Sequence, residues 1–289
     1  MRYTIFKCCP TALFLETCET AIREILARLG VDLAAFDGFG CCGYPLRNVN
    51  FKAYVLCSAR DMALAERHRV SILTFCNCCF GSLKHARHFL AQDPALREEI
   101  NRTLAKEGLE YTGRAVVKHL LEVFYQDVGP EAIGRKLGPR YEGLKVATHY
   151  GCHLLRPSPV VQFDDPVNPV VFDRLVQATG AGSVPWRAKL DCCGSPSWGI
   201  YDQISINMTK YKITDASESG ADCLCLACPF CYLHFNQVIE VSRSNGGTIP
   251  PMPIFLYTQL LGLGLGLEPA AVGLSPEQTD VLYKVVLKK

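Results

Sequence analysis

The arrangement of cysteines constrains this chain more than any other feature of its sequence. Of the 289 residues, 16 are cysteines, and none lies between Cys79 and Cys152. A chain of this length with 49% hydrophobic residues builds a core without covalent cross-links. Charged residues interrupt the N-terminal stretch, which lacks the apolar core of a signal peptide. We therefore expect a cytoplasmic protein whose thiols serve metal binding or redox chemistry.

Charge and hydropathy exclude two classes of partner. Lys and Arg number 30 against 28 Asp and Glu, which gives a net charge of +2 and no broad basic field for nucleic acid. The longest apolar stretch, Ile254–Leu267, has 14 residues and contains Gln259 and three glycines. Because a membrane-spanning helix needs about 20 apolar residues, we expect no membrane span and interpret this stretch as a buried element.

The cysteines form two copies of one motif. Each copy has a single cysteine, a Cys-Cys-Gly triplet and a CxxC pair, with intervals of 31 and 32 residues in the first copy and 39 and 33 in the second. The first copy consists of Cys9, Cys41, Cys42, Cys76 and Cys79, and the second of Cys152, Cys192, Cys193, Cys228 and Cys231. The offset is about half the chain, which indicates an internal duplication.

The segments around the motif repeat as well. Short β-rich runs lead to the first cysteine and to the CxxC of each copy, and helical patterns follow each CxxC. The expected strands lie in 3–9, 68–76, 145–152 and 219–228, and the expected helices in 18–30, 80–90 and 232–243. This pattern predicts an α/β fold of two pseudo-symmetric repeats, each a small, mainly parallel sheet flanked by helices, with the cysteines, as candidate metal ligands, at the strand ends.

The seam between the repeats is expected at Glu142–Leu144. We therefore divide the chain into an N-terminal domain, 1–143, and a C-terminal domain, 144–289. Residues 117–134 and 253–273 close the two halves in similar ways. The charged stretch Pro94–Lys106 has a helical pattern, and its simplest interpretation is a solvated helix face.

Five cysteines per copy exceed what the common metal sites need. A structural zinc ion and a cubane 4Fe-4S cluster each take four ligands, and the side chains of adjacent cysteines diverge. The count favours a larger or non-standard iron-sulfur assembly, or a cubane with one thiol held for catalysis. Zinc and a metal-free protein remain weaker alternatives. Gly43 and Gly194 fit a bulky cluster, since a residue without a Cβ lets the backbone pass close to it.

The motif resembles that of the CCG-domain proteins. The sequences HYGCHLLRP (149–157), DCCG (191–194) and CPFC (228–231) are similar to the B subunit of heterodisulfide reductase, and the resemblance covers essentially the whole chain. It implies that each copy binds a non-cubane 4Fe-4S cluster through its five cysteines, two clusters in all.

Six cysteines depart from the family pattern or lie outside it. Cys8 stands where family members often have glycine, and Cys78 lies inside the first CxxC, so both are alternative ligands in the first half. The match in spacing to the second half favours Cys9 and Cys79. The remaining cysteines, interpreted as small buried hydrophobic residues, are Cys18, Cys57, Cys223 and Cys225.

The resemblance implies the reduction of a disulfide to two thiols, as in methanogenesis, where the family substrate is the mixed disulfide of coenzymes M and B. In this mechanism the sulfur–sulfur bond is split between two clusters, and no protein nucleophile takes part. The chain has no GxGxxG loop and no ferredoxin-type run of cysteines. The resemblance therefore also implies two partners from the same complex, a flavin-containing A subunit and a ferredoxin-like iron-sulfur C subunit.

An anionic substrate requires local cations. Arg47 follows the first Cys-Cys-Gly, and His153 and Arg156 follow Cys152, so we expect these three side chains to bind substrate through charge-assisted hydrogen bonds. The basic run Lys84–His88 is the next candidate, although a solvated helix face or a partner-docking patch is its simpler interpretation.

Two alternative functions remain open. In the first alternative, the chain is an electron-transfer iron-sulfur subunit of a larger oxidoreductase complex. In the second, it reduces a different disulfide, of a protein or a small thiol, in an organism that makes no methane. Disulfide reduction with artificial electron donors distinguishes the first alternative from a reductase.

Overall fold

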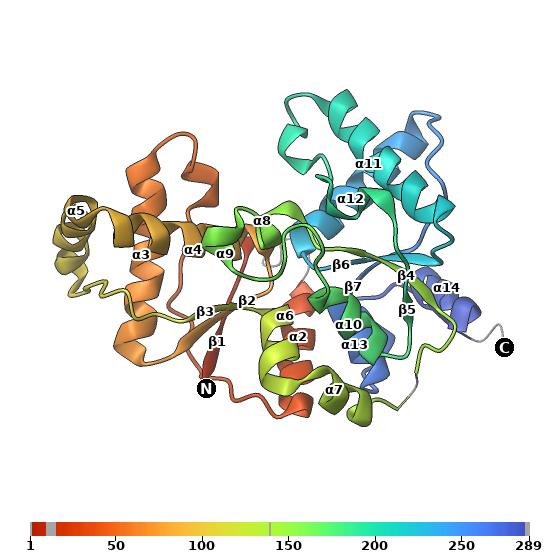
Figure 1. Ribbon diagram of the computed structural model, residues 1–289, viewed down its shortest axis with the longest axis horizontal. Coiled ribbons are helices and arrows are strands. Elements are labelled where there is room, and N and C mark those ends of the chain that lie inside the picture. The colour runs from red at the N-terminus through yellow and green to blue at the C-terminus, as the bar shows by residue number, and fades with distance from the viewer. Residues whose placement is uncertain (1, 10–15, 139, 287–289) are drawn as a thin grey trace.

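Two parallel sheets lie side by side in the computed structural model, which describes residues 2–9, 16–138 and 140–286 (Figure 1). The first sheet has the order β1-β2-β3 and the second β5-β4-β6-β7, and every strand pairing is parallel. The strands are β1 (Tyr3–Phe6), β2 (Ser71–Thr74), β3 (Val117–His119), β4 (Lys145–His149), β5 (Gly182–Ser183), β6 (Cys223–Leu226) and β7 (Ile254–Leu256). The predicted α/β fold of two repeats is confirmed.

Helices cover both sheets. They are α2 (Glu16–Leu29), α3 (Phe51–His68), α4 (Asn77–Gln92), α5 (Pro94–Leu104), α6 (Leu120–Glu122), α7 (Pro130–Lys136), α8 (Cys152–Leu155), α9 (Ser158–Val161), α10 (Val171–Ala178), α11 (Asp202–Glu218), α12 (Pro229–Ser244), α13 (Tyr257–Gly264) and α14 (Pro276–Val286). A π-helix, Val123–Val128, follows α6. None of the described helices is both long and apolar enough to span a bilayer.

The strands are short, and most of their residues are buried. All four residues of β1, β2 and β6 are buried, as expected for parallel strands that helices cover on either side. The apolar stretch 254–267 divides into β7 and α13, and both are largely buried. The charged helix α5 buries Leu96, Ile100 and Leu104 and exposes most of its charged residues, in agreement with its sequence pattern.

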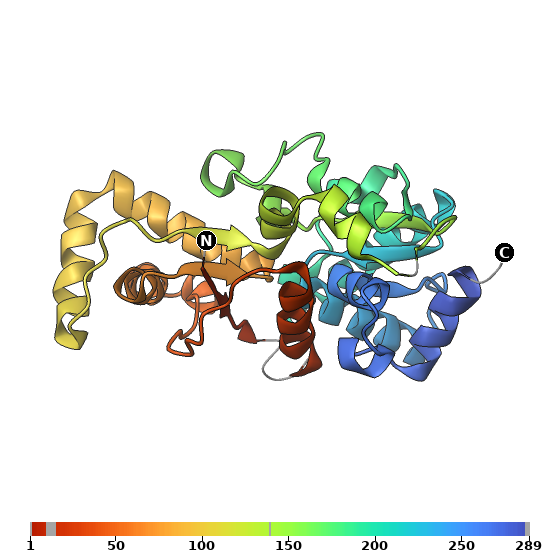
Figure 2. The same cartoon turned by 90° about the horizontal axis from the view of Figure 1, so that it is seen from below.

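The two halves are interlocked by helices. Helix α2 follows β1 in the chain but packs against α13 and the 3₁₀ helix Pro269–Val272 of the second half (Figure 2). In the other direction, α8 and α9 follow β4 but pack against α4 of the first half. The predicted boundary at 143/144 separates the two sheets, whereas these three helices each pack against the half on the other side of it. A division into two domains there stays a prediction.

Candidate metal centre

The first cysteine of each CxxC lies at the N-terminus of a helix. β2 and β6 each end two residues before it, and Cys76 and Cys228 are the N-cap residues of α4 and α12. The exposed N–H groups and partial positive charge of a helix N-terminus favour a thiolate. The backbone N–H of Asn77 donates to Cys228 Sγ at 3.4 Å, which joins the two halves at this point.

Four cysteines of the first copy are connected by side-chain hydrogen bonds. Cys42 contacts Cys41 and Cys79, and Cys79 contacts Cys76. Hydrogen bonds from Cys41 and Cys79 lower the pKa of the Cys42 thiol to about 3. The fifth residue, Cys9, is exposed and lies within electrostatic range of Cys41. These five residues are called the first thiol set.

All five cysteines of the second copy are connected in the same way. The contacts run from Cys152 to Cys192, Cys193, Cys231 and Cys228 in turn. Hydrogen bonds from Cys152 and Cys193 lower the pKa of the Cys192 thiol to about 2. These five residues are called the second thiol set.

The two thiol sets meet at one point. Cys228 Sγ lies 3.9 Å from Cys76 Sγ, so nine of the ten predicted ligands form one chain of neighbouring sulfur atoms. Soft thiolates at this density are the ligands that iron-sulfur clusters require. The donor atoms therefore fit iron-sulfur clusters, whereas the number of clusters and the assignment of individual ligands stay predictions.

The other cysteines fall into two groups. Cys8 and Cys78 both make side-chain hydrogen bonds with Cys76, so both alternative ligands lie beside the first thiol set. Of the cysteines interpreted as hydrophobic residues, three are buried and one is half-buried; the buried ones are Cys18, Cys223 and Cys225, and the half-buried one is Cys57.

The Cys-Cys-Gly turns have the same geometry in both halves. Gly43 has φ +80° and Gly194 has φ +95°, in the left-handed region that favours glycine. The N–H of each glycine donates to the first sulfur of its own triplet, Cys41 or Cys192, at 3.4 Å. Each turn thus offers backbone N–H groups to its thiols.

Two of the predicted substrate contacts lie together. Tyr44 Oη is 3.3 Å from His153 Nε2, and the Arg47 guanidinium carbon lies 5.6 Å from the centroid of the Tyr44 ring. Burial lowers the pKa of His153 below its usual value, and the positive charge of Arg47 lowers it further. Burial also raises the pKa of Tyr44 to about 12. Tyr44, which the sequence did not indicate, thus connects residues from the two halves.

Arg156 and the basic run 84–88 have other surroundings. The guanidinium of Arg156 donates to the carbonyl oxygens of Leu190 and Pro166 at 3.2 and 3.4 Å. Lys84 Nζ lies 5.0 Å from the centroid of the Phe80 ring on α4, and burial lowers its pKa. A role for these residues in substrate binding stays a prediction.

Three buried polar residues near the thiol sets were not found from the sequence. Asp61 is buried within electrostatic range of Cys42 in the first set, and burial raises its pKa to about 7. Lys212 is buried within electrostatic range of Cys193 in the second set, and burial lowers its pKa to about 8. His149 ends β4, and burial lowers its pKa well below the usual value. Asp61 and Lys212 follow their cysteine pairs at the same spacing, and this equal spacing is the sequence feature that could have identified them.

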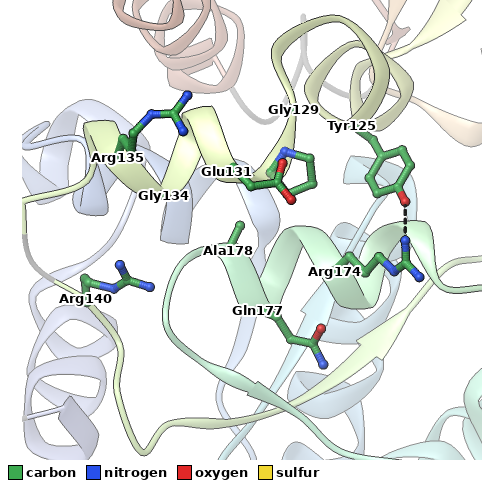
Figure 3. A pocket seen from close by; sticks show the side chains of 10 residues that line it. Tyr125, Gly129, Glu131, Gly134, Arg135, Arg140, Arg174, Gln177 and Ala178 are labelled. Atoms are coloured by element: carbon green, nitrogen blue, oxygen red, sulfur yellow. Dashed lines mark hydrogen bonds between the residues drawn. The ribbon is translucent and has the colours of Figure 1, made fainter.

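A separate cavity lies between α7 and α10 (Figure 3). Its volume is about 810 Å³, and Arg135, Arg140, Arg174 and Glu131 line it. Arg174 donates to the hydroxyl of Tyr125 at 2.8 Å. No cysteine is among the described residues that line this cavity, so it does not belong to the metal centre.

Comparison with known families and proteins shows what this chain is similar to. The model of the CCG cysteine-rich domain matches residues 3–84 and 146–236. The B subunit of a ferredoxin:CoB-CoM heterodisulfide reductase from Methanosarcina mazei is 36% identical over 89% of this chain and 86% of its own length. An 8-methylmenaquinol:fumarate reductase membrane anchor subunit of Wolinella succinogenes is 32% identical over 96% of this chain and 97% of its own length.

The fold also occurs in a solved structure. The crystal structure of a hypothetical protein from Helicobacter pylori superposes with a TM-score of 0.73 and 15% identity, and the match covers 94% of this chain. The chain spans about half the length of that protein. The likeness supports the arrangement of two small parallel sheets and carries no information on chemistry.

Proposed function

The chain belongs to the CCG cysteine-rich domain family that includes the B subunit of heterodisulfide reductase, and on this premise we propose that it is the catalytic subunit of a heterodisulfide reductase-type complex. It would reduce a disulfide, CoM-S-S-CoB or a related substrate, to two thiols. The observation that carries the proposal is the contact between the two thiol sets at Cys76 and Cys228, where the sulfur atoms lie 3.9 Å apart. Two redox sites this close can serve one substrate bond.

The proposal assigns one non-cubane 4Fe-4S cluster to each thiol set. When bound, the two clusters would supply the two electrons that reduction of a disulfide requires. The cysteines hold the iron, and their CxxC pairs are therefore not free for thiol–disulfide exchange. For this reason we assign no protein nucleophile.

The residues around Tyr44 would bind the substrate. Tyr44 positions His153 from the second half, and Arg47 lies over the ring of Tyr44. An anionic disulfide that bound here would meet one permanent positive charge and one neutral imidazole. Arg156 is the third proposed contact, and the bonds from its guanidinium to two backbone carbonyls would fix its orientation.

The proposal includes a complex and its location. The chain would receive electrons from a ferredoxin-like C subunit and a flavin-containing A subunit, in the cytoplasm. The halves 1–143 and 144–289 would act as two domains, each with one cluster.

Iron content tests the cluster assignment. Protein prepared without oxygen should contain about eight irons and eight sulfides per chain, whereas about four or fewer contradicts two clusters. The loaded protein should reduce an anionic disulfide when a viologen donates the electrons.

Kinetics of arginine variants test the substrate site. Arg47→Ala and Arg156→Ala should each raise the KM for an anionic disulfide about tenfold, because a charge-assisted hydrogen bond is lost. The control is Arg102→Ala, an exposed arginine of α5 that pairs with Glu98. An unchanged KM in either variant removes that residue from the site.

An electron-transfer subunit is the second candidate. The relative from Wolinella succinogenes, a fumarate reductase membrane anchor subunit, is nearly as similar as the heterodisulfide reductase subunit. A relay of this kind would bind the same eight irons but show no disulfide reduction with artificial donors. Activity with a protein disulfide alone would instead favour a different physiological disulfide.

A further inference from the structure

The two halves can be aligned without gaps from the Cys-Cys-Gly turn into the following helix. Tyr54 on α3 and Ser205 on α11 each lie eleven residues after the glycine of their own turn, and each carbonyl packs against that glycine. Ser58 and Thr209, four residues further on, donate their hydroxyls to the carbonyls of the second cysteine in each pair, at 2.7 and 2.8 Å. The backbones of the two sites are therefore equivalent, residue for residue.

The charges at the next equivalent position are opposite. Three residues after these hydroxyls, α3 carries Asp61 and α11 carries Lys212, with exposures of 1% and 0%. Asp61 Oδ1 accepts from the N–H of Gly40 at 2.8 Å, and Lys212 Nζ donates to the carbonyl of Asp191 at 3.0 Å. Gly40 and Asp191 themselves occupy equivalent positions, each directly before a cysteine pair. A buried acid thus supports the first turn, and a buried base supports the second.

Both ionisable groups lie in the field of the thiols beside them. Asp61 interacts electrostatically with Arg60, 3.9 Å away, and with Cys42. Lys212 interacts with Asp191 and with Cys193, Cys231 and Cys192. Lys212 Nζ also lies 4.6 Å from the centroid of the Trp186 ring, which stabilises the ammonium ion at this depth. Screening by water is weak at such positions, so the charges act on whatever the thiols hold.

A second difference lies at the ends of two equivalent strands. Phe6 ends β1 and His149 ends β4, and each lies three residues before the first cysteine of its copy. Both ring nitrogens of His149 are buried, and neither has a hydrogen-bond partner in the described part of the chain. A ring nitrogen of His149 and the sulfurs of Cys193 and Cys231 all lie within 4.8 Å of one another. A neutral imidazole has one N–H to donate, whereas Phe6 has none.

We propose that the second thiol set holds the cluster of higher reduction potential, because Lys212 and an N–H donated by His149 stabilise the added electron there, while Asp61 opposes it at the first set. Reduction adds negative charge, which a buried cation stabilises and a buried carboxylate destabilises. Hydrogen bonds to cluster sulfur also raise the potential. The inference rests on the proposed function, since it requires two bound clusters, and it adds that the first electron to enter the chain resides in the second half.

The test is an anaerobic redox titration of the iron-loaded full chain with dithionite at about pH 7.5, followed by paramagnetic resonance. This pH lies between the pKa of about 7 for Asp61 and the pKa of about 8 for Lys212, so both groups are mostly charged. The wild-type protein should show two separate reduction steps. Lys212→Met and Lys212→Gln should both lower the upper step and leave the iron content unchanged. Lys210→Met, which removes an exposed charge from the same helix, should move neither step.

The first half provides the reciprocal test. Asp61→Asn keeps an oxygen for the N–H of Gly40 but removes the charge, so it should raise the lower step.

His149 in the second half provides a third test. His149→Phe, which installs the residue of the first half, should lower the upper step, and His149→Gln, which retains an N–H donor, should lower it less. Asp61→Asn keeps the proposal testable if the lysine variants do not fold.

Three results overturn the inference while the proposed function stands. These are a single reduction step for both clusters, fully loaded Lys212 variants with unchanged steps, and a shift of the lower step in those variants. Loss of about half the iron in His149→Phe and His149→Gln would make His149 a ligand and overturn its role as a donor. A wild-type chain that binds no iron overturns the proposed function itself, and this inference with it.

Discussion

In the first half of the molecule a buried carboxylate, Asp61, supports the Cys-Cys-Gly turn, and in the second half a buried ammonium, Lys212, does so from the same helix position. Around these groups the halves agree in their thiols, their left-handed glycines and the hydroxyls that donate to the second cysteine. The agreement covers the groups that hold the thiols in place, and the difference is one of buried charge. Under the inference above, this difference would give the two bound clusters different reduction potentials.

Equivalent cysteines should have equivalent effects, and their loss is the largest effect that we expect. Cys79→Ser and Cys231→Ser each remove the last cysteine of one copy. Each variant should retain about half of the iron and lose disulfide reduction entirely, because one cluster cannot supply both electrons. Iron and sulfide counts after anaerobic preparation measure this directly.

The control for this pair is Cys57→Ser, which changes a half-buried cysteine of α3 outside the motif and should keep all the iron. Full iron in Cys79→Ser together with half in Cys231→Ser would break the equivalence. It would indicate that Cys78, which is hydrogen-bonded to Cys76, replaces the missing ligand in the first half.

The start of each copy is where the halves differ most in their thiols. Cys8 occupies the position that Gly151 holds in the second half, and it is buried, whereas Cys9 is exposed. We expect Cys9→Ser to lose the first cluster, about half the iron, and Cys8→Ser to keep it. The same iron count decides the matter, and the opposite result would place Cys8 in the first thiol set.

The repeat made much of the fold predictable from the sequence. Because the strands end at fixed distances before cysteines, the spacing located β1, β2, β4 and β6, and the order of strands and helices indicated the architecture. The spacing could not show that α2 packs on the second half. An amphipathic helix reveals which face it buries, but not which surface covers that face.

The candidate site was predicted less completely, for a related reason. Cysteines can be recognised as candidate ligands from their chemistry alone. Asp61 and Lys212, in contrast, have the sequence pattern of exposed polar residues on surface helices, and only the fold shows that they are buried. Asn77 is similar, since its side chain donates to the carbonyl of Tyr150 at 2.7 Å across the two halves. Such contacts depend on tertiary packing and leave no local pattern in the sequence.

The two glycine turns should be equally intolerant of a side chain. A Cβ at Gly43 would lie 2.6 Å from the carbonyl oxygen of Tyr54, and one at Gly194 would lie 2.8 Å from that of Ser205. Clash and left-handed backbone strain together should lower the free energy of unfolding by about 2 to 4 kcal/mol in each alanine variant, measured by urea titration.

Strain and clash can be separated with a third glycine. Gly108 has φ +67°, but in the described part of the chain no atom lies within 4 Å of the position that a Cβ would take there. Gly108→Ala should therefore cost only about 1 kcal/mol. If Gly43→Ala and Gly194→Ala cost no more than this control, the close approach of the backbones has no energetic weight.

Removal of the hydroxyls that support the cysteine pairs should change the free energy of unfolding least, and by slightly different amounts in the two halves. Ser58→Ala removes one hydrogen bond, to the carbonyl of Cys42, and should cost about 1 kcal/mol in the free energy of unfolding. Thr209 also lies 3.1 Å from His234 Nε2, so Thr209→Val removes two partners and should cost more than Ser58→Ala. Thr103→Val, at an exposed position of α5, is the reference and should cost almost nothing. Equal costs for Ser58→Ala and Thr209→Val would mean that the imidazole of His234 adds nothing to the stability of the second turn.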